Sequence, residues 1–80
     1  MNDQQIRTHI EQLVDEEHRL REHGDAGTLN AADRTRLEGI EVQLDQYWDL
    51  LRQRRARRDA GQDPNVAHLR SENVVEHYRQ

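Results

Sequence analysis

The sequence predicts an all-α protein in which two long helices form an antiparallel hairpin, followed by a short, partly helical C-terminal segment. Three observations predict this fold. Apolar residues recur every three or four positions along two stretches, which is the spacing of a coiled-coil seam. A short glycine-containing stretch separates them, and a short connection makes neighbouring helices antiparallel. Charged residues make up 35 % of the chain, a composition typical of coiled coils.

The first helix is expected over about residues 3–23. Asn2 or Asp3 is placed to cap it, by accepting hydrogen bonds from backbone N–H groups that have no partner within the helix. Glu17 interrupts the apolar series, either as a polar group in a core layer or as a side chain that reaches solvent at the edge of the seam. The other seam residues, spaced four or three apart or flanking Glu17, are Ile6, Ile10, Leu13 and Leu20.

The turn is expected over residues 24–30 and the second helix over about residues 31–58. Gly24 suits the left-handed conformation that ends many helices. Asn30 is the expected cap of the second helix, and Thr28 is the alternative. Trp48 lies beside the seam of this helix, and we place it in the hairpin core with the seam residues Leu37, Ile40, Leu44, Tyr47 and Leu51.

The two seams match each other in five layers when the chain is folded at the turn. The same register places Arg21 near Glu38 and Arg7 near Asp49, so that acidic residues of the second helix face basic residues of the first. This agreement between seam and flanks favours the hairpin. The layers pair Leu20 with Leu37, Glu17 with Ile40, Leu13 with Leu44, Ile10 with Tyr47, and Ile6 with Leu51.

Residues 61–80 form a separate tail with one or two short helices. Gly61 and Pro64 are expected to stop the second helix. Asp63 followed by Pro64 predicts a capped short helix over 64–69, and Ser71 could cap another over 72–78. The tail either docks on the hairpin or stays free. The residues that would dock are apolar: Val66, Leu69, Val74, Val75 and Tyr78.

Two helices bury only one side of each seam residue, so a further element should cover the seam. We favour a second copy of the chain, which would give a homodimeric four-helix bundle. The alternative cover is the tail of the same chain. The seam does not distinguish a dimer from a tetramer. Apolar residues that lie off the seam and suit such a contact are Val14, Val42, Trp48 and Leu50.

An arginine-rich segment ends the second helix, with five arginines in seven residues: Arg52, Arg54, Arg55, Arg57 and Arg58. Guanidinium groups bind carboxylates and phosphates well, so these residues are candidates for contacting an acidic protein or a ribonucleoprotein surface. The alternative is a solvated helix end whose positive charge complements the helix dipole. Because the chain carries a net charge of -4, direct nucleic-acid binding is disfavoured. A ribosome- or transcription-associated factor that contacts nucleic acid is the alternative function.

No residue pattern indicates catalysis, a metal site or a cofactor. The sequence has no cysteine, which excludes a disulfide and a thiolate metal site. Its histidines lack ligand spacing, and its serine and threonines lie in no nucleophile motif. Tyr47 and Trp48 could mark a binding hot spot, or they could simply belong to the core. We therefore expect a protein-binding module rather than an enzyme.

The chain is expected to be cytoplasmic. No apolar run approaches the ~18 residues that a membrane-spanning helix needs. The N-terminus lacks the basic start and apolar block of a signal peptide.

The run Leu44–Arg57, which reads LDQYWDLLRQRRAR, resembles the signature of a family of short actinobacterial proteins known only as a domain of unknown function. The stretches Glu16–Arg21, Asp63-Pro64 and Val74–Glu76 are also similar to that family, so the resemblance spans nearly the whole chain. It implies a small stand-alone protein of an actinobacterial cytoplasm. At the position of Tyr47 the family more often has cysteine, so a thiol role in relatives would not transfer. The resemblance implies no activity, substrate or catalytic residue.

Overall fold

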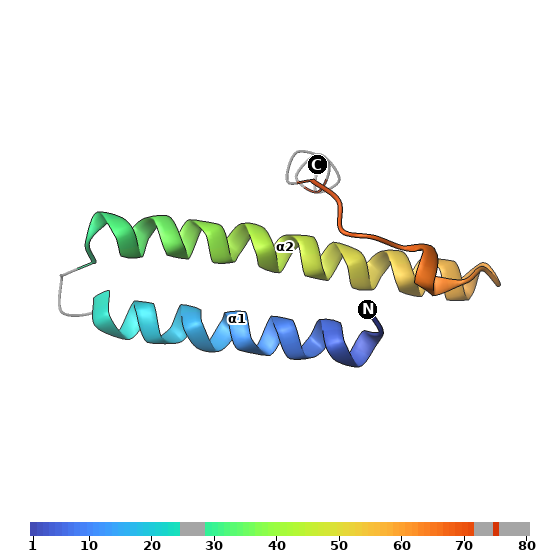
Figure 1. Ribbon diagram of the computed structural model, residues 1–80, viewed down its shortest axis with the longest axis horizontal. Coiled ribbons are helices and arrows are strands. Elements are labelled where there is room, and N and C mark those ends of the chain that lie inside the picture. The colour runs from blue at the N-terminus through green and yellow to red at the C-terminus, as the bar shows by residue number, and fades with distance from the viewer. Residues whose placement is uncertain (25–28, 72–74, 76–80) are drawn as a thin grey trace.

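The computed structural model describes residues 1–24, 29–71 and 75. These form two α-helices, α1 (Asp3–Gly24) and α2 (Ala31–Asp59), and a short 3-10 helix, η1 (Pro64–Val66). The two α-helices run antiparallel, side by side, in a flat and elongated molecule of 50 × 26 × 15 Å (Figure 1). No strand occurs in the described ranges. The predicted all-α helical hairpin is confirmed.

A reciprocal pair of hydrogen bonds begins α1. The Oδ1 atom of Asn2 accepts from the backbone N–H of Gln5 (2.8 Å), and Oε1 of Gln5 accepts from the backbone N–H of Asn2 (2.9 Å). Each bond satisfies a donor that the helix itself leaves unpaired. Asn2 is therefore the cap, which leaves the Asp3 side chain available for other contacts. The helix ends at Gly24, and most of the expected turn, including Thr28, lies outside the described residues.

Asn30 caps α2, as its sequence position suggests: its Oδ1 accepts from the backbone N–H of Asp33 at 2.8 Å. At the other end, Gly61 adopts a φ of 72°, the left-handed conformation that glycine tolerates best. The backbone N–H of Gln62 then donates to the carbonyl of Arg57 (2.7 Å). This closes the helix end and reverses the chain.

The core lies between α1 and the C-terminal half of α2. Ile6, Ile10 and Leu50 form its buried centre. Removing such side chains from water stabilises the fold by about 1.5 to 3 kcal/mol each. Leu13 and Ile40 are also buried, whereas the expected seam residues Leu20 and Leu37 are half-buried. Further half-buried residues pack against the centre: Val14, Leu44, Tyr47, Leu51 and Ala67.

Two residues depart from the expected core. Leu50, which the seam leaves out, is only 4 % exposed, and Trp48, expected in the core, is 47 % exposed. The two side chains lie about 200° apart around a helix. Because Leu50 packs with Ile6 and Ile10, Trp48 points away from the core.

The described part of the tail docks on α2. After α2 the chain turns back along it (Figure 1). The Nε2 of Gln53 donates both to the carbonyl of His68 (2.7 Å) and to Oδ2 of Asp49 (2.9 Å). The Nε2 of Gln46 donates to the carbonyl of Arg70 (3.2 Å), and the Nε of Arg70 lies 3.2 Å from Oδ2 of Asp49. Asp49 is only 1 % exposed. Its ionic partner is Arg70 of the tail, and not Arg7 as the register of the seam predicts.

The first short helix of the tail is shorter than expected. Asp63 caps it by accepting from the backbone N–H of Asn65 (2.9 Å), but η1 ends at Val66 and not near residue 69. The helix expected over 72–78 lies largely outside the described residues. Within it, Val75 is buried, and its backbone N–H donates to the carbonyl of Ser71 (3.1 Å).

Candidate functional site

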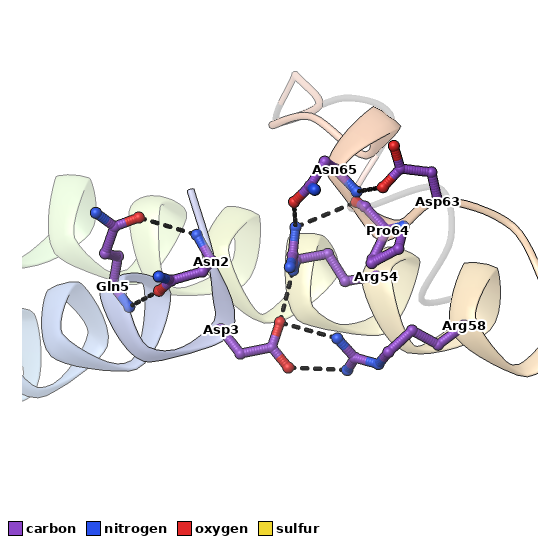
Figure 2. A network of polar contacts seen from close by, with 8 residues as sticks. All are labelled: Asn2, Asp3, Gln5, Arg54, Arg58, Asp63, Pro64 and Asn65. Carbon is purple, nitrogen blue, oxygen red and sulfur yellow. Dashed lines mark hydrogen bonds and ion pairs between the residues drawn. The ribbon is translucent and has the colours of Figure 1, made fainter.

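One arginine joins three segments of the chain. The Nε of Arg54 donates to Oδ1 of Asp3 at 2.6 Å, and its Nη1 donates to the Pro64 carbonyl (3.2 Å) and to Oδ1 of Asn65 (3.1 Å). Figure 2 shows Arg54 between Asp3 on one side and the tail residues on the other. Its side chain is 6 % exposed. Arg54 therefore fixes the start of α1 and the start of the tail to α2.

The Asp3 carboxylate also accepts hydrogen bonds from Arg58, which lies one helical turn after Arg54 in α2. The Nη1 and Nη2 of Arg58 donate to the two carboxylate oxygens of Asp3 at 3.2 and 2.8 Å (Figure 2). The hydrogen bonds from Arg58 and Arg54, together with their positive charges, lower the pKa of Asp3 to about 2. Asp3 is thus ionised at neutral pH. We call the Asp3, Arg54 and Arg58 group the Asp3 clamp.

The arginines of the segment have different surroundings, although the sequence presents them as one run. Arg54 is buried in the clamp, and Arg58 is held by Asp3. Arg52 and Arg55 are exposed. Arg57 is half-buried and lines a separate hollow of about 250 Å³ with Gln53, Ala56, Gln62 and Arg70. Successive helix residues point about 100° apart, which is why neighbours in the run separate in space.

Three of these arginines meet at one open groove of about 550 Å³. We call it the Trp48 groove. Arg7 enters it from α1, opposite the end of α2. Arg7 is absent from the arginine set predicted from the sequence, although the register that pairs Ile6 with Leu51 places it beside that set. The groove is lined by Asp3, Arg7, Trp48, Leu51, Arg52, Arg55, Arg58 and Asp59.

The makeup of the Trp48 groove suits binding. Four guanidinium groups face two carboxylates, and the Asp3 carboxylate already accepts hydrogen bonds from the clamp. Planar guanidinium groups bind carboxylates with two parallel hydrogen bonds. Trp48 and Leu51 add apolar surface at the same place. Among these lining residues there is no serine, threonine, cysteine or histidine that could act as a nucleophile or proton carrier.

A smaller hollow of about 230 Å³ lies elsewhere between the helices, with His9, Glu16, Arg36 and Tyr47 in its lining. The rings of His9 and Tyr47 stack with centroids 5.2 Å apart. The Nη2 of Arg36 donates to Oε1 of Glu16 at 2.6 Å, which lowers the pKa of Glu16 and raises that of Arg36. The two charged groups satisfy each other. This hollow therefore offers less to a charged partner than the Trp48 groove does.

Metal-binding groups and membrane-spanning helices are absent from the described part of the chain. Across residues 1–24, 29–71 and 75, no three His, Asp or Glu side chains are grouped so as to hold a metal ion. None of the helices described there is long and apolar enough to cross a membrane.

Comparisons with known proteins agree with the resemblance seen in the sequence. The family described as "Protein of unknown function (DUF2630)" matches residues 2–80. The uncharacterised proteins Rv0898c of Mycobacterium tuberculosis and Mb0922c of Mycobacterium bovis are each 46 % identical to this chain over 79 residues. That alignment covers 95 % of this chain and 88 % of each relative. No solved structure matches the chain.

Proposed function

The chain belongs to the DUF2630 family of proteins of unknown function, and from its surface we propose that it is a non-enzymatic interaction module that docks an acidic protein surface in the Trp48 groove. The docking residues are the exposed Arg52 and Arg55, with Arg7 and Trp48 beside them. This narrows the arginine set inferred from the sequence. Arg54 is buried in the Asp3 clamp and Arg57 lines another hollow, so neither belongs to the proposed contact.

The observation that carries the proposal is the exposure of Trp48 among guanidinium groups. Trp48 is 47 % exposed and lines the same groove as Arg52 and Arg55. Tryptophan and arginine are the residues most enriched where protein interfaces concentrate their binding energy. Removing a large aromatic side chain from water is favourable, so a partner that covers Trp48 would gain binding free energy. The groove therefore combines an apolar anchor with charges that select a carboxylate-bearing partner.

The charge of the groove favours a protein partner over nucleic acid. Asp59 lines the groove with the arginines, and the chain as a whole carries a net charge of -4. A nucleic-acid backbone would meet this negative charge along its length, whereas an acidic protein segment need only contact the groove.

Self-association is part of the proposal. The half-buried Leu37, Leu44 and Leu51 leave the seam of the hairpin incompletely covered. The described tail contacts α2 through Gln46, Gln53 and Arg54. A second copy would add cover that two helices and this tail do not supply.

Photo-cross-linking tests the proposal. A photoreactive residue is placed at position 52 and, as a matched control, at position 34, which is another exposed arginine of α2. In cell extract, position 52 should give several-fold more cross-links to acidic protein segments than position 34. Adding Arg55→Glu should remove the excess. Equal yields at the two positions, or cross-links chiefly to RNA or DNA, would contradict the proposal.

A further inference from the structure

The outward face of α2 carries charges in an order that is complementary to itself. Six residues along it, spaced three or four apart, fall within an arc of about 100° around the helix. Between Arg34 and Asp59, which lie on the same arc nearer the two ends of the helix, acidic residues come before Trp48 and arginines come after it. Asp45 is half-buried and the other five are exposed. In chain order they are Glu38, Glu41, Asp45, Trp48, Arg52 and Arg55.

We propose that a second copy of this chain occupies the Trp48 groove, with the two α2 helices antiparallel about a two-fold axis beside Trp48. The inference rests on the proposed function and names the acidic surface as the chain's own. Arg55 and Glu41 are each seven positions from Trp48, in opposite directions. In an antiparallel pair centred on Trp48, Arg55 therefore faces Glu41 of the partner subunit. Arg52 is four positions after Trp48 and Asp45 three positions before it, so Arg52 lies within one position of Asp45 of the partner subunit.

Symmetry doubles each of these contacts, because a two-fold interface uses the same surface on both copies. Four ion pairs then flank a central pair of tryptophans, which have a favourable aromatic contact of their own. A parallel pairing in the same register would instead place arginine against arginine and acid against acid. The charge order thus favours one orientation and opposes the other.

The intramolecular contact of Glu41 does not compete strongly with this arrangement. Glu41 lies 3.3 Å from Arg21 of α1, and both side chains are more than half exposed. Exposed ion pairs of this kind hold weakly. Glu41 therefore keeps carboxylate oxygens available for a second arginine.

The test is a charge swap read out by solution mass. One variant carries Arg52→Glu and Arg55→Glu, and the other carries Glu41→Arg and Asp45→Arg. We expect the unmodified full chain to be a dimer by light scattering and each variant alone to dissociate at least tenfold more readily. An equimolar mixture should form a 1:1 heterodimer in native mass spectrometry, because every pair is then opposite in charge again. Arg19→Glu with Arg34→Glu, both exposed and off the proposed pairs, should remain dimeric.

Circular dichroism checks that each variant keeps its helices. Should a double variant unfold, the single changes Arg52→Glu and Asp45→Arg replace it in the same mixing experiment. A full chain that is monomeric at every concentration, or a mixture that fails to pair, would overturn the inference. If position 52 of that monomer still cross-links acidic segments of other proteins, the docking groove stands and only its occupant is wrong. If it cross-links none, both proposals fail.

Discussion

The carboxylate of Asp3 and the guanidinium of Arg54 lie 51 positions apart in the sequence and 2.6 Å apart in space. The contact joins the helices at the end of the hairpin opposite the covalent turn. Arg54 also binds the tail through Pro64 and Asn65. One arginine side chain thus holds the first residue of α1, the last part of α2 and the start of the tail in register.

The Asp3 clamp should make stability depend on acid. The pKa of Asp3 is about 2 in the folded chain, against an ordinary value of 3.8. The carboxylate therefore stabilises the fold above pH 3.8, and this contribution is lost as the pH falls from there through 2. Asp3→Asn should lower the free energy of unfolding by about 1 to 2 kcal/mol at pH 7.

Urea denaturation at pH 7, 4, 3 and 2, followed by circular dichroism, measures the effect. The difference between the native chain and Asp3→Asn should shrink toward pH 2. Asp15→Asn, which removes an exposed acid from α1, is the control. A constant difference at all four pH values would mean that the clamp adds no ionic stabilisation.

Arg54 and Arg55 should respond differently to the same change. Arg54→Lys keeps the charge but cannot reach Asp3, Pro64 and Asn65 together, and buried groups left unpaired cost about 1 to 3 kcal/mol. Arg55→Lys alters an exposed side chain and should change stability by less than about 0.5 kcal/mol. Thermal melts of the two variants measure the difference. Equal melting temperatures would argue against a structural role for Arg54.

Gln53 should hold the tail on α2. Its amide donates to both Asp49 and the His68 carbonyl, so Gln53→Leu leaves two acceptors without that donor and should cost about 1 to 3 kcal/mol. Cleavage after Arg70 by an arginine-specific protease under native conditions should become several-fold faster. Gln43→Leu, an exposed glutamine of the same helix, should leave the rate unchanged. Similar rates in both variants would separate tail docking from Gln53.

Two glycines should respond to alanine with opposite sign. Gly39 lies inside α2 with open space where a Cβ would stand, so Gly39→Ala should stabilise the chain by about 0.5 to 1 kcal/mol. Gly61 has a φ of 72°, and Gly61→Ala should destabilise it by about 1 kcal/mol. Chemical denaturation of both variants tests the pair. Loss of stability in Gly39→Ala would mean that α2 is packed more closely there.

The hairpin is readable from the sequence because its information is local. The three- and four-residue spacing identifies two helices that share a seam, and Asn30 marks the start of the second. The burial of Leu50 and Asp49 could not be predicted in this way, because residues outside the seam help to bury each of them. Leu50 belongs to the core cluster on which Ala67 also packs, and Asp49 is paired with Arg70.

The candidate site can be predicted from the sequence only in part, because it too depends on contacts between distant segments. The arginine run is conspicuous, but sequence cannot assign Arg54 to the interior without knowing that Asp3 and the tail meet there. The outward position of Trp48 follows once Leu50 is known to face the core. The tail thus decides which residues of α2 remain available to a partner.

The Asp3 clamp also sets the direction in which the hairpin opens. The layer nearest the covalent turn, Leu20 with Leu37, is half-buried, whereas Ile6 and Ile10 near the clamp are buried. Local stability therefore increases from the end of the hairpin that the turn links covalently toward the end that the clamp holds. Unzipping should start beside the turn, and amide hydrogens around Ile6 and Leu50 should exchange last. The end of the hairpin that has no covalent link is its most persistent part.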